Sequence, residues 1–535
     1  MLSYRKLAMR VLGRPLHTEG IDSPRPASQR AAAFILTAAM LTTLAAPAFA
    51  DIWRIENGDI TISAGESGNN VTQNNNTTYG DTNTIITNQN KDTASSHTVT
   101  IEAKDKDDKV EVTLKDVNID TSSRNKAAVS VTGEGDTNIK LDGDNALKSD
   151  IYRSGIYGSG SLTISGGEND SLTAQGGSGA NGISSSGSLT ISGGTVTANG
   201  DDGGRGISSS GSVTISGGST VTANGGSGTI SGGDGIWSGG GVTISGGSTV
   251  TANGGNGGSL VGGDGIRSGG GLTVSDGTVT AKGGNGDSKD GYGGDGIRSG
   301  GVVTISGNTV NAAGGYGGKV GGYGICSFDR VAISGGTVEA AGGNGSTGGG
   351  SGIYSSVIDL SGSLELTAKA GSSNGKALSQ KGSELVLDTI KDKLGPGAKV
   401  TATDADGKVI DQVSTPRPVE PEESSSSSDG GSAAPSAPAS PLPGLTVTDK
   451  DGPRISYTST QSGNTLTVCV GRLTASFRIS LAALRQLRAE GIETITFQTI
   501  LCSTTLSVDE LLAMGGEDAE AVLTHRFTDS SLTVG

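Results

Sequence analysis

The sequence predicts an all-β chain whose central part is a three-sided parallel β-helix, and three observations carry that prediction. A repeat occurs eight times between residues 155 and 370: Gly-Ile-x-Ser, a turn, Leu-Thr-Ile-Ser-Gly-Gly, Thr-Val-Thr-Ala and a glycine-rich run. Its isoleucines recur every 24 to 31 residues, a spacing typical of stacked coils. The distance from each isoleucine to the valine of the third strand is nearly constant, whereas the glycine-rich run changes length freely, so each coil has a fixed core and one loop of variable length. The isoleucines are Ile156, Ile183, Ile207, Ile236, Ile266, Ile297, Ile325 and Ile353.

Each repeat contains three short alternations of apolar and polar residues, for example at 236–237, 242–244 and 250–252. A period of two puts Ile, Val and Ala on one side of a strand and Thr and Ser on the other. Three strands per coil therefore wrap a narrow interior. Glycine pairs such as those at 246–247 and 254–255 are expected to supply the positive φ that the turns between strands require.

The composition alone is ambiguous, because 93 glycines and 32% hydrophobic residues in 535 also occur in disordered, low-complexity chains. The ordered recurrence of Ile, Val and Leu argues against disorder, since a stack of coils buries the apolar side that one coil cannot bury alone. Glycine does not fall at every third position, which excludes collagen. The nine-residue spacing of calcium-binding nonapeptide rolls is also missing.

Four parts of differing composition follow one another after residue 50. Residues 51–150 are expected to form an N-terminal cap and the first irregular coils, and residues 151–415 the regular β-helix with its C-terminal cap. Residues 416–443, rich in Pro, Ser and Ala, read as an extended linker. Residues 444–535 are expected to form a small α+β module.

Within the module, the pattern predicts strands and two helices. The strands are expected at 465–470, 476–479 and 493–498. Ser480 is expected to cap a helix that runs to Glu490, and Gly491 to end it. Ser507 and Glu510 have the spacing of a capping box at the start of a second helix.

Residues 1–50 have the organisation of a secretory signal peptide. Six basic residues precede an apolar stretch at 31–44, and Ala48-Phe49-Ala50 is a small-x-small cleavage site. Cleavage after Ala50 would make Asp51 the first residue of the mature chain. No later apolar run approaches the ~20 residues that span a bilayer. We therefore expect a secreted or cell-surface protein with no transmembrane segment in the mature chain.

The chain is acidic, and it becomes more so when the leader is removed. Taking away six basic and two acidic residues changes the formal charge from −15 to −19. Such a surface repels nucleic acid and favours cations as partners. Of the three cysteines, Cys326 is expected to be a tolerated small residue, whereas Cys469 and Cys502 can pair in an oxidising exterior, which sequence alone does not decide.

Three segments carry a resemblance to a known family: residues 112–119, residues 127–131 and the recurrent unit at 182–194. Over roughly residues 59–370 the chain resembles the bacterial carbohydrate-binding-domain proteins. The resemblance implies a secreted, right-handed, pectate-lyase-like β-helix. It also implies calcium-dependent, non-catalytic binding of acidic plant polysaccharide such as polygalacturonate. It does not place the calcium ligands residue by residue.

One outward column combines aromatic and basic side chains. The residue after each anchor isoleucine is expected to point outward, with successive copies about 4.8 Å apart. An aromatic ring beside two arginines is suited to stack on a sugar ring and to pair with uronate carboxylates. The alternative is that these are ordinary solvated residues on a face that accepts many kinds of side chain. The glycan-binding candidates in this column are Tyr157, Trp237, Arg267, Arg298 and Tyr354.

A second column consists of Asp234, Asp264 and Asp295, each in an Asp-Gly-Ile sequence where the glycine-rich loop ends. Oxygen ligands from adjacent coils can share a hard cation such as calcium. Asp-Gly is also a common turn sequence. The alternative interpretation, which we favour, is that these aspartates serve the turns and bind no metal. These three residues are the metal-site candidates.

Two further functions have weaker support. Paired threonines, for example Thr249 and Thr251, recur on one face as in ice-binding proteins, but the ladder breaks at Asn311 and Glu339. A polysaccharide lyase needs a base beside acidic calcium ligands, and Asp264 with Arg267, or Asp295 with Arg298, is the nearest approach. No Ser-His-Asp set or metal-ligand cluster is visible in the sequence.

The function that the sequence favours is secreted, non-catalytic binding of polysaccharide, with calcium as the expected cofactor. The main alternative is a structural or adhesive surface protein in which the β-helix acts as a spacer for residues 444–535. The two differ in which part of the chain carries the binding. Residues 51–415 bind glycan in the first case, and residues 444–535 bind a partner in the second.

Overall fold

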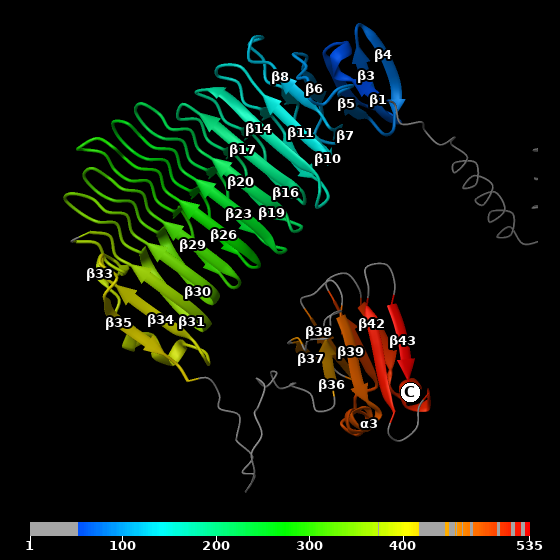
Figure 1. Cartoon of the computed structure of the whole chain (residues 1–535), viewed down its shortest axis with the longest axis vertical. Coiled ribbons are helices and arrows are strands. Elements are labelled where there is room, and N and C mark those ends of the chain that lie inside the picture. Colours follow the sequence, from blue (N-terminus) through cyan, green and yellow to red (C-terminus); the bar gives the residue numbers. More distant parts are fainter. Residues whose placement is uncertain are drawn as a thin grey trace, which may run out of the picture. The chain divides into compact units, whose positions relative to one another are not determined.

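The structure is a computed structural model that describes residues 52–372, 374–416, 445–448, 455, 457–462, 464–470, 475–499, 503–514, 519–525 and 530–534. The chain divides into two compact units, residues 1–421 and 422–535. The first unit is a parallel β-helix of about 13 turns, which confirms the predicted fold class (Figure 1). The predicted leader and nearly all of the predicted linker lie outside the described residues.

Each regular coil contributes one strand to each of three parallel ladders, and the first ladder follows the anchor isoleucines. Ile236 pairs in register with Ile207 of the preceding coil and Ile266 of the next. The strands of this first ladder are β2 (Ile60–Gly65), β6 (Val99–Glu102), β9 (Val129–Thr132), β12 (Ile156–Gly158), β15 (Ile183–Ser185), β18 (Ile207–Ser209), β21 (Ile236–Ser238), β24 (Ile266–Ser268), β27 (Ile297–Ser299), the beginnings of β30 (Ile325–Ala341) and β31 (Ile353–Lys369), and β32 (Leu378–Gln380).

The second ladder follows the Leu-Thr-Ile sequence of the repeat and continues into the middle of β30 and β31. Its other strands are β1 (Ile52–Arg54), β5 (Ile85–Thr87), β7 (Lys109–Lys115), β10 (Asp136–Asp142), β13 (Ser161–Ser165), β16 (Leu189–Ser192), β19 (Val213–Ser216), β22 (Val242–Ile244), β25 (Leu272–Val274) and β28 (Val303–Ile305). A short 3-10 helix, η1 (Ile55–Asn57), follows β1.

The third ladder follows Thr-Val-Thr-Ala and ends on β34 after the final parts of β30 and β31. Its strands are β8 (Asn118–Asp120), β11 (Asp144–Lys148), β14 (Ser171–Ser178), β17 (Thr195–Asp201), β20 (Thr220–Asn224), β23 (Ser248–Asn253), β26 (Gly277–Lys282), β29 (Thr309–Ala313) and β34 (Lys399–Thr403). The paired threonines of the repeat lie on this ladder in register, and Asn311 and Glu339 occupy the same position further along.

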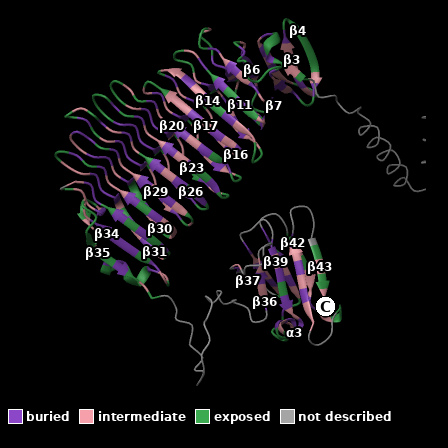
Figure 2. Ribbon diagram, viewed as in Figure 1, coloured by how far each residue is buried: buried purple, intermediate pink, exposed green. Residues whose placement is uncertain are grey.

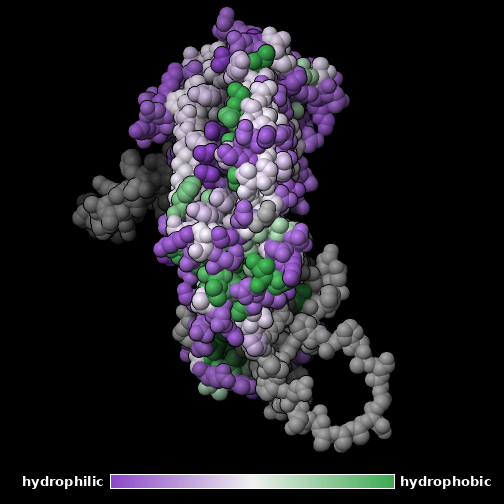
Figure 3. Space-filling model, turned by 90° about the vertical axis from the view of Figure 1, so that its left-hand side faces the viewer, coloured by the Kyte–Doolittle hydropathy of each residue, from purple (hydrophilic) through white to green (hydrophobic). Residues whose placement is uncertain are grey.

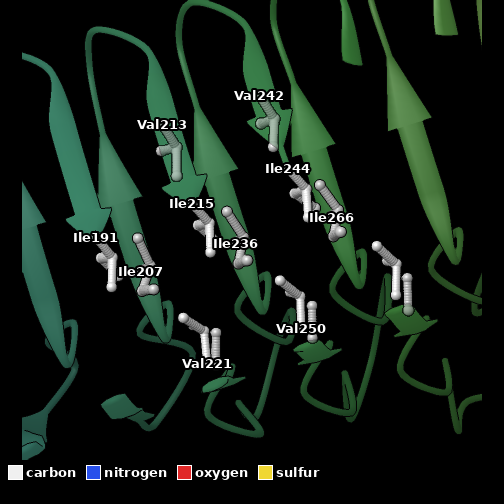
Figure 4. Close-up of a cluster of buried hydrophobic side chains, with 14 of the residues drawn as sticks. Ile191, Ile207, Val213, Ile215, Val221, Ile236, Val242, Ile244, Val250 and Ile266 are labelled. Carbon is white, nitrogen blue, oxygen red and sulfur yellow. The ribbon is translucent and has the colours of Figure 1, made fainter. Parts of the chain in front are cut away.

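The core is a stack of similar apolar side chains, because in-register parallel pairing brings each apolar residue next to the corresponding residue of the neighbouring coil (Figure 4). Ile236, Val250 and Ile244 are all fully buried. The alternation along the strands is visible as buried residues separated by more exposed ones (Figure 2). Burial of each such side chain contributes about 1.5–3 kcal/mol, so the stack gains stability with every coil added.

Antiparallel segments close both ends of the β-helix. At the beginning, β3 (Gly68–Gln73) pairs with β2 and with β4 (Asn76–Asp81). At the end, β35 (Val409–Ser414) pairs with β34, and β33 (Ser383–Glu384) with β32, beside the 3-10 helix η2 (Leu387–Lys393). Such segments cover strand edges that would otherwise offer free backbone groups.

The variable runs of the repeat fold out and back as loops, here called the glycine loops: residues 225–235, 254–265, 283–296, 314–324 and 342–352. They lie one above another along one side of the stack (Figure 1). Bridges join Gly228 to Gly257 and Gly257 to Gly286, so the parallel pairing continues into the loops. The loops vary in length, but their bases are a continuous extension of the β-helix.

The two glycine pairs named above serve different purposes. Gly246 and Gly247 have φ of 63° and 71°, as expected for the turn between strands. The expectation was wrong for Gly254 and Gly255, which do not have positive φ. Instead, the two arms of a loop pack so closely that a Cβ on Gly254 would lie 2.0 Å from the carbonyl oxygen of Gly263. The reason for glycine there is space, not backbone conformation.

The described residues of the second unit form two four-stranded sheets and two helices. Ser480 caps the helix α3 by accepting a hydrogen bond from the backbone N–H of Ala483 at 3.2 Å, as expected. Phe477 and Phe497 lie in its core with ring centroids 4.8 Å apart. One sheet consists of β36 (Leu445–Thr448), β39 (Ala475–Ser480), β42 (Glu520–His525) and β43 (Ser530–Val534). The other consists of β37 (Thr458–Ser462), β38 (Thr465–Cys469), β40 (Thr494–Gln498) and β41 (Ser503–Ser507); the helices are α3 (Leu481–Ala489) and α4 (Val508–Met514).

Two further predictions concern a disulfide in the second unit and the presence of a membrane-spanning segment. Cys502 lies outside the described residues, so its pairing with Cys469 stays a prediction; the thiol of Cys469 lies 3.4 Å from Oε1 of Gln498. Among the described residues, no helix combines the length and apolar character needed to cross a membrane.

Candidate functional site: a groove beside the glycine loops

The aromatic and basic column predicted from the sequence exists on the first ladder. Trp237 pairs in register with Arg267, and Arg267 with Arg298, so these three side chains lie on successive coils. Cys326 and Tyr354 follow on the next two coils. Tyr157 belongs to the same column but is separated from Trp237 by the coils of Ser184 and Ser208. The five glycan-binding candidates therefore do not form one cluster.

The three aspartates of the second column lie beside this ladder, where each glycine loop returns to the coil. Asp234, Asp264 and Asp295 are all buried. Oδ1 of Asp234 accepts the backbone N–H of Asp264 at 2.9 Å, and Oδ1 of Asp264 accepts that of Asp295 at 2.7 Å. Oδ1 of Asp295 accepts the N–H of Tyr323 at 2.7 Å. One oxygen of each carboxylate thus joins its coil to the next.

The second oxygen of each aspartate faces an arginine. Oδ2 of Asp295 lies 3.2 Å from Nη1 of Arg298, and Oδ2 of Asp264 lies 4.0 Å from Nη1 of Arg267. Asp234 is paired differently: its Oδ2 lies 3.2 Å from Nε of Arg205, which comes from the preceding coil. Buried carboxylates are costly unless paired, and here guanidinium groups are the partners.

Burial and mutual repulsion change the acidity of the aspartates. Burial raises the pKa of Asp264 well above its ordinary value, and the neighbouring carboxylates of Asp295 and Asp234 raise it further. Burial also raises the pKa of Asp295, against the opposing effects of the Tyr323 N–H and of Arg298. Burial is thus the main reason why both carboxyl groups hold protons more tightly than ordinary aspartates do.

Above the aspartates runs a hollow of about 730 Å³, here called the arginine groove, which extends over several coils between the first ladder and the glycine loops. Its lining includes Arg205, Arg267, Arg298, Tyr323 and the three aspartates on one side, and Ser231, Val261, Tyr292 and Val320 on the loop side. The loop-side residues are aligned by bridges from Ser231 to Val261, Val261 to Tyr292 and Tyr292 to Val320. The groove therefore has a charged wall and a mostly apolar wall.

The surface on the side from which the loops project is mixed in character. Near-neutral bands lie beside hydrophilic and hydrophobic residues (Figure 3). Tyr292 is exposed on the loop side, and Nζ of Lys319 lies 5.6 Å from the centre of its ring. Among the residues that line the groove, three arginines stand against three buried carboxylates, and Lys319 is not part of the lining.

Aromatic residues near the groove are partly covered by other side chains. The guanidinium of Arg205 lies over the ring of Trp237, 4.4 Å from its centroid, and Trp237 does not line the groove. Tyr354 stacks on Tyr323 with ring centroids 4.8 Å apart. Cys326 is buried, and burial together with Asp295 raises the pKa of its thiol to about 12.

The sequence pattern missed two groups that complete the groove. Arg205 and Tyr323 each precede a Gly-Ile pair, the position that aspartate occupies in the three coils between them. An alignment of the repeats on the residue before Gly-Ile would have found both. Tyr292 and Val261 lie in the variable loops, where the repeat gives no register from which to place them.

The aspartate column does not have the geometry of a calcium site in the described part of the chain. No group of three or more His, Cys, Asp or Glu side chains there is arranged to hold a metal ion. Each Oδ1 is already occupied by a backbone N–H, and each Oδ2 faces a guanidinium. Calcium needs six to eight oxygen ligands, and arginine competes with it for these.

In comparisons with known proteins, the chain matches no family model, no curated protein and no solved structure.

Proposed function

We propose that the protein binds an acidic polysaccharide without cleaving it, and that the arginine groove is the binding site. The single observation that carries this proposal is the row of Arg205, Arg267 and Arg298 along a groove whose other wall holds Tyr292. Guanidinium groups pair with carboxylates through two parallel hydrogen bonds, and a tyrosine ring packs against the apolar face of a sugar.

Arg267 is the guanidinium most available to a ligand. Its side chain is 49% exposed, against 36% for Arg298 and 35% for Arg205. Its distance of 4.0 Å from Asp264 is also the longest of the three ion pairs. A carboxylate of the polysaccharide therefore displaces less existing interaction at Arg267 than at its neighbours.

A polymer suits the groove better than a small molecule does. Successive coils repeat every ~4.8 Å, so similar groups recur along the groove at a constant step. A repeating uronate chain presents its carboxylates in the same way. The overall charge of the protein is negative, so binding depends on this local row of cations and weakens as salt screens it.

Whether binding requires calcium is a question for experiment. The resemblance noted from the sequence implies calcium-assisted binding, whereas the arginine row needs no metal to pair with carboxylates. Retention that survives a chelator supports direct pairing with arginine. Retention that requires calcium points to ligands outside the set formed by Asp234, Asp264 and Asp295.

The test is retention of the purified chain on immobilised polygalacturonate and on neutral polysaccharides, each with calcium and with chelator. Arg267→Ser is the informative variant, because Ser184 and Ser208 occupy the same column and show that the coil accepts serine there. We expect retention on polygalacturonate by the unaltered chain and at least tenfold weaker affinity for the variant.

The matched control is Arg330→Ser, since the Arg330 side chain is 50% exposed and Arg330 does not line the groove. Its affinity should equal that of the unaltered chain. No retention on any acidic polysaccharide, or equal losses in both variants, would refute the proposal. Release of unsaturated uronate products would show a lyase instead of a binding protein.

A second function, that of a spacer, is favoured by a different observation. The backbone ladders run without interruption through about 13 turns and into the glycine loops, so the β-helix is held together along its length. In this role the second unit would carry the partner contacts. Binding of a surface partner that is lost when residues 445–535 are removed, with no glycan retention by the full chain, would favour the spacer.

Export is part of both proposals and rests on residues 1–50 alone. Their basic, apolar and small-x-small segments follow the order of a cleavable leader. Mass spectrometry of the protein recovered from the culture medium tests this proposal. A mature chain that begins at Asp51 supports it, and retention of the full leader inside the cell contradicts it.

A further inference from the structure

A second hollow, here called the tyrosine pocket, lies on the early coils of the β-helix and has a volume of about 630 Å³. It shares no lining residue with the arginine groove. Its lining includes Thr100, Ser130, Tyr152, Arg153, Tyr157 and Ser184. The pocket is thus a separate feature with its own chemistry, and Tyr157 belongs to it and not to the groove.

A column of hydroxyl groups lies in the tyrosine pocket. Thr100 pairs in register with Ser130, Ser130 with Tyr157, and Tyr157 with Ser184, so these four residues stand on successive coils of the first ladder. No hydrogen bond joins any of the four side-chain hydroxyls to another described residue. All four are free to donate to and accept from a ligand.

Inward serines of the same ladder behave differently, because their hydroxyls donate hydrogen bonds to the backbone. Ser185 donates to the carbonyl oxygen of Gly160 at 3.0 Å, and Ser209 donates to that of Gly187 at 2.8 Å. Ser238 donates to the carbonyl of Gly211 at 2.8 Å. These inward hydroxyls are satisfied by backbone carbonyls, and so is that of Thr132 at the edge of the pocket, which donates to the carbonyl oxygen of Ile101 at 3.5 Å, whereas the four hydroxyls of the column are left for a ligand.

Two tyrosines supply the apolar surface of the pocket. Tyr157 is 43% exposed and Tyr152 is 77% exposed. Tyr152 has φ of 59°, and its ring lies against the backbone of Gly179, where an added Cβ would come within 2.9 Å of Cε1. Exposed aromatic rings beside free hydroxyls match the two sides of a sugar: the apolar ring face and the polar edge.

Both cationic residues that line the pocket, Lys126 and Arg153, are engaged by other side chains. No aspartate or glutamate lines it, and Nζ of Lys126, a lining residue, lies 3.0 Å from Oδ2 of Asp59. Burial opposes ionisation of Asp59, but hydrogen bonds from the N–H of Thr98, from Lys126 and from Arg124 outweigh it and hold its pKa well below its usual range. Asp59 therefore remains charged and keeps Lys126 occupied. Nε of Arg153 donates to Oδ1 of Asn125 at 3.3 Å.

From this geometry we infer that the tyrosine pocket is a binding site for a neutral oligosaccharide, distinct from the proposed site for acidic polysaccharide. The sugar rings pack on Tyr157 and Tyr152, and the hydroxyls of Thr100, Ser130 and Ser184 exchange hydrogen bonds with the sugar hydroxyls. This inference rests on the residues of the pocket and does not require the arginine groove to bind anything.

The experiment is calorimetric titration of the full chain with cellohexaose, xylohexaose and mannohexaose in turn, and with hexagalacturonate for comparison. The informative variants are Tyr157→Ser and Tyr152→Asn. Serine already occupies the positions on either side of Tyr157 in the column, at Ser130 and Ser184, and asparagine tolerates the positive φ of Tyr152. The control is Tyr316→Ser, because Tyr316 is exposed and lines neither hollow.

We expect at least one neutral hexasaccharide to bind, with a loss of tenfold or more in Tyr157→Ser, a smaller loss in Tyr152→Asn and no change in Tyr316→Ser. The inference is overturned if no neutral hexasaccharide binds, or if Tyr157→Ser, shown to be folded by its circular dichroism, binds as well as the unaltered chain. Arg267→Ser separates the two sites: it should weaken hexagalacturonate binding and leave neutral binding intact.

Discussion

Nε of Arg205 lies 3.2 Å from Oδ2 of Asp234, although the two residues come from different coils. Arg205 occupies the position before Gly-Ile that Asp234 occupies in its own coil, so an ion pair connects successive members of one column. The same guanidinium covers the ring of Trp237 at 4.4 Å. One side chain thus neutralises the first buried aspartate and fixes the aromatic residue beside it.

Arg205→Ala should destabilise the β-helix by about 1–3 kcal/mol, because it leaves the buried carboxylate of Asp234 without its cation. It should also shift the emission of Trp237 to longer wavelength as water reaches the ring. Chemical unfolding and tryptophan fluorescence measure the two effects. Arg153→Ala, which removes an exposed arginine on the early coils, should change neither; equal effects of both variants would contradict the assignment.

Asp264→Asn should stabilise the protein at neutral pH by about 1 kcal/mol. The folded pKa of Asp264 lies above its unfolded value, so the folded protein holds the proton where the unfolded chain has lost it. Its contribution to stability is fully present below the unfolded pKa and falls as pH rises through the folded pKa. Asparagine keeps the Oδ1 acceptor, as Asn181 does when it accepts the N–H of Arg205 at 2.8 Å.

Unfolding measured at pH 5 and pH 8 checks this prediction. The gain of Asp264→Asn over the unaltered chain should be larger at pH 8 than at pH 5, because the contribution of the raised pKa of Asp264 falls as pH rises. Asp290→Asn, at an exposed loop position, should show no such difference. A gain that grows as pH falls would contradict the raised pKa of Asp264.

Binding of polygalacturonate should strengthen by about 2- to 10-fold as pH falls from 8 towards 5. Asp264 and Asp295 take up protons at higher pH than ordinary aspartates do because their pKa values are raised, while the arginines keep their charge. The ligand carboxylates stay largely ionised, since ordinary carboxyl groups titrate near pH 4. Calorimetric affinities measured across this range should be flatter for Asp264→Asn, and an affinity that falls with acidification would count against the arginine groove.

Gly254→Ala should destabilise the glycine loops by about 1–3 kcal/mol or more, because its methyl group meets the carbonyl oxygen of Gly263. Gly348→Ala is the matched control, since a Cβ there meets nothing within 4 Å and its φ is not positive. Hydrogen exchange of the loop amides and thermal unfolding measure the difference. Similar behaviour of the two variants would show that the close packing of the loop arms contributes little.

Much of the architecture was predictable because a β-helix converts a sequence repeat directly into position in space. Alignment of the anchor isoleucines gave the first ladder in register, and with it the neighbours of Trp237 and Arg267. The Thr-Val-Thr-Ala and Leu-Thr-Ile segments gave the other two ladders in the same way. In-register stacking needs no information beyond the repeat itself.

The candidate site was less predictable, because it depends on side chains and loops that do not follow the repeat. The contact between Arg205 and Asp234 crosses from one coil to the next and requires a particular side-chain direction. The loop wall with Tyr292 exists because bridges from Val261 to Tyr292 and from Tyr292 to Val320 join successive loops, and the varying loop lengths conceal this pairing in the sequence. The pocket at Tyr157 combines a turn with four coils, of which those of Thr100 and Ser130 precede the regular repeats.

The serine coils between Tyr157 and Trp237 set how far apart the two hollows lie. Each coil adds a step of ~4.8 Å, and the pairing from Tyr157 through Ser184 and Ser208 to Trp237 preserves the register at every step. Each of these coils also contributes to a hollow, Ser184 to the tyrosine pocket and Arg205 to the arginine groove, so neither coil can be deleted without loss of lining residues. The distance between the two hollows is thus inherited as a whole number of repeats, and only the insertion of a further coil between them would change it while keeping those residues.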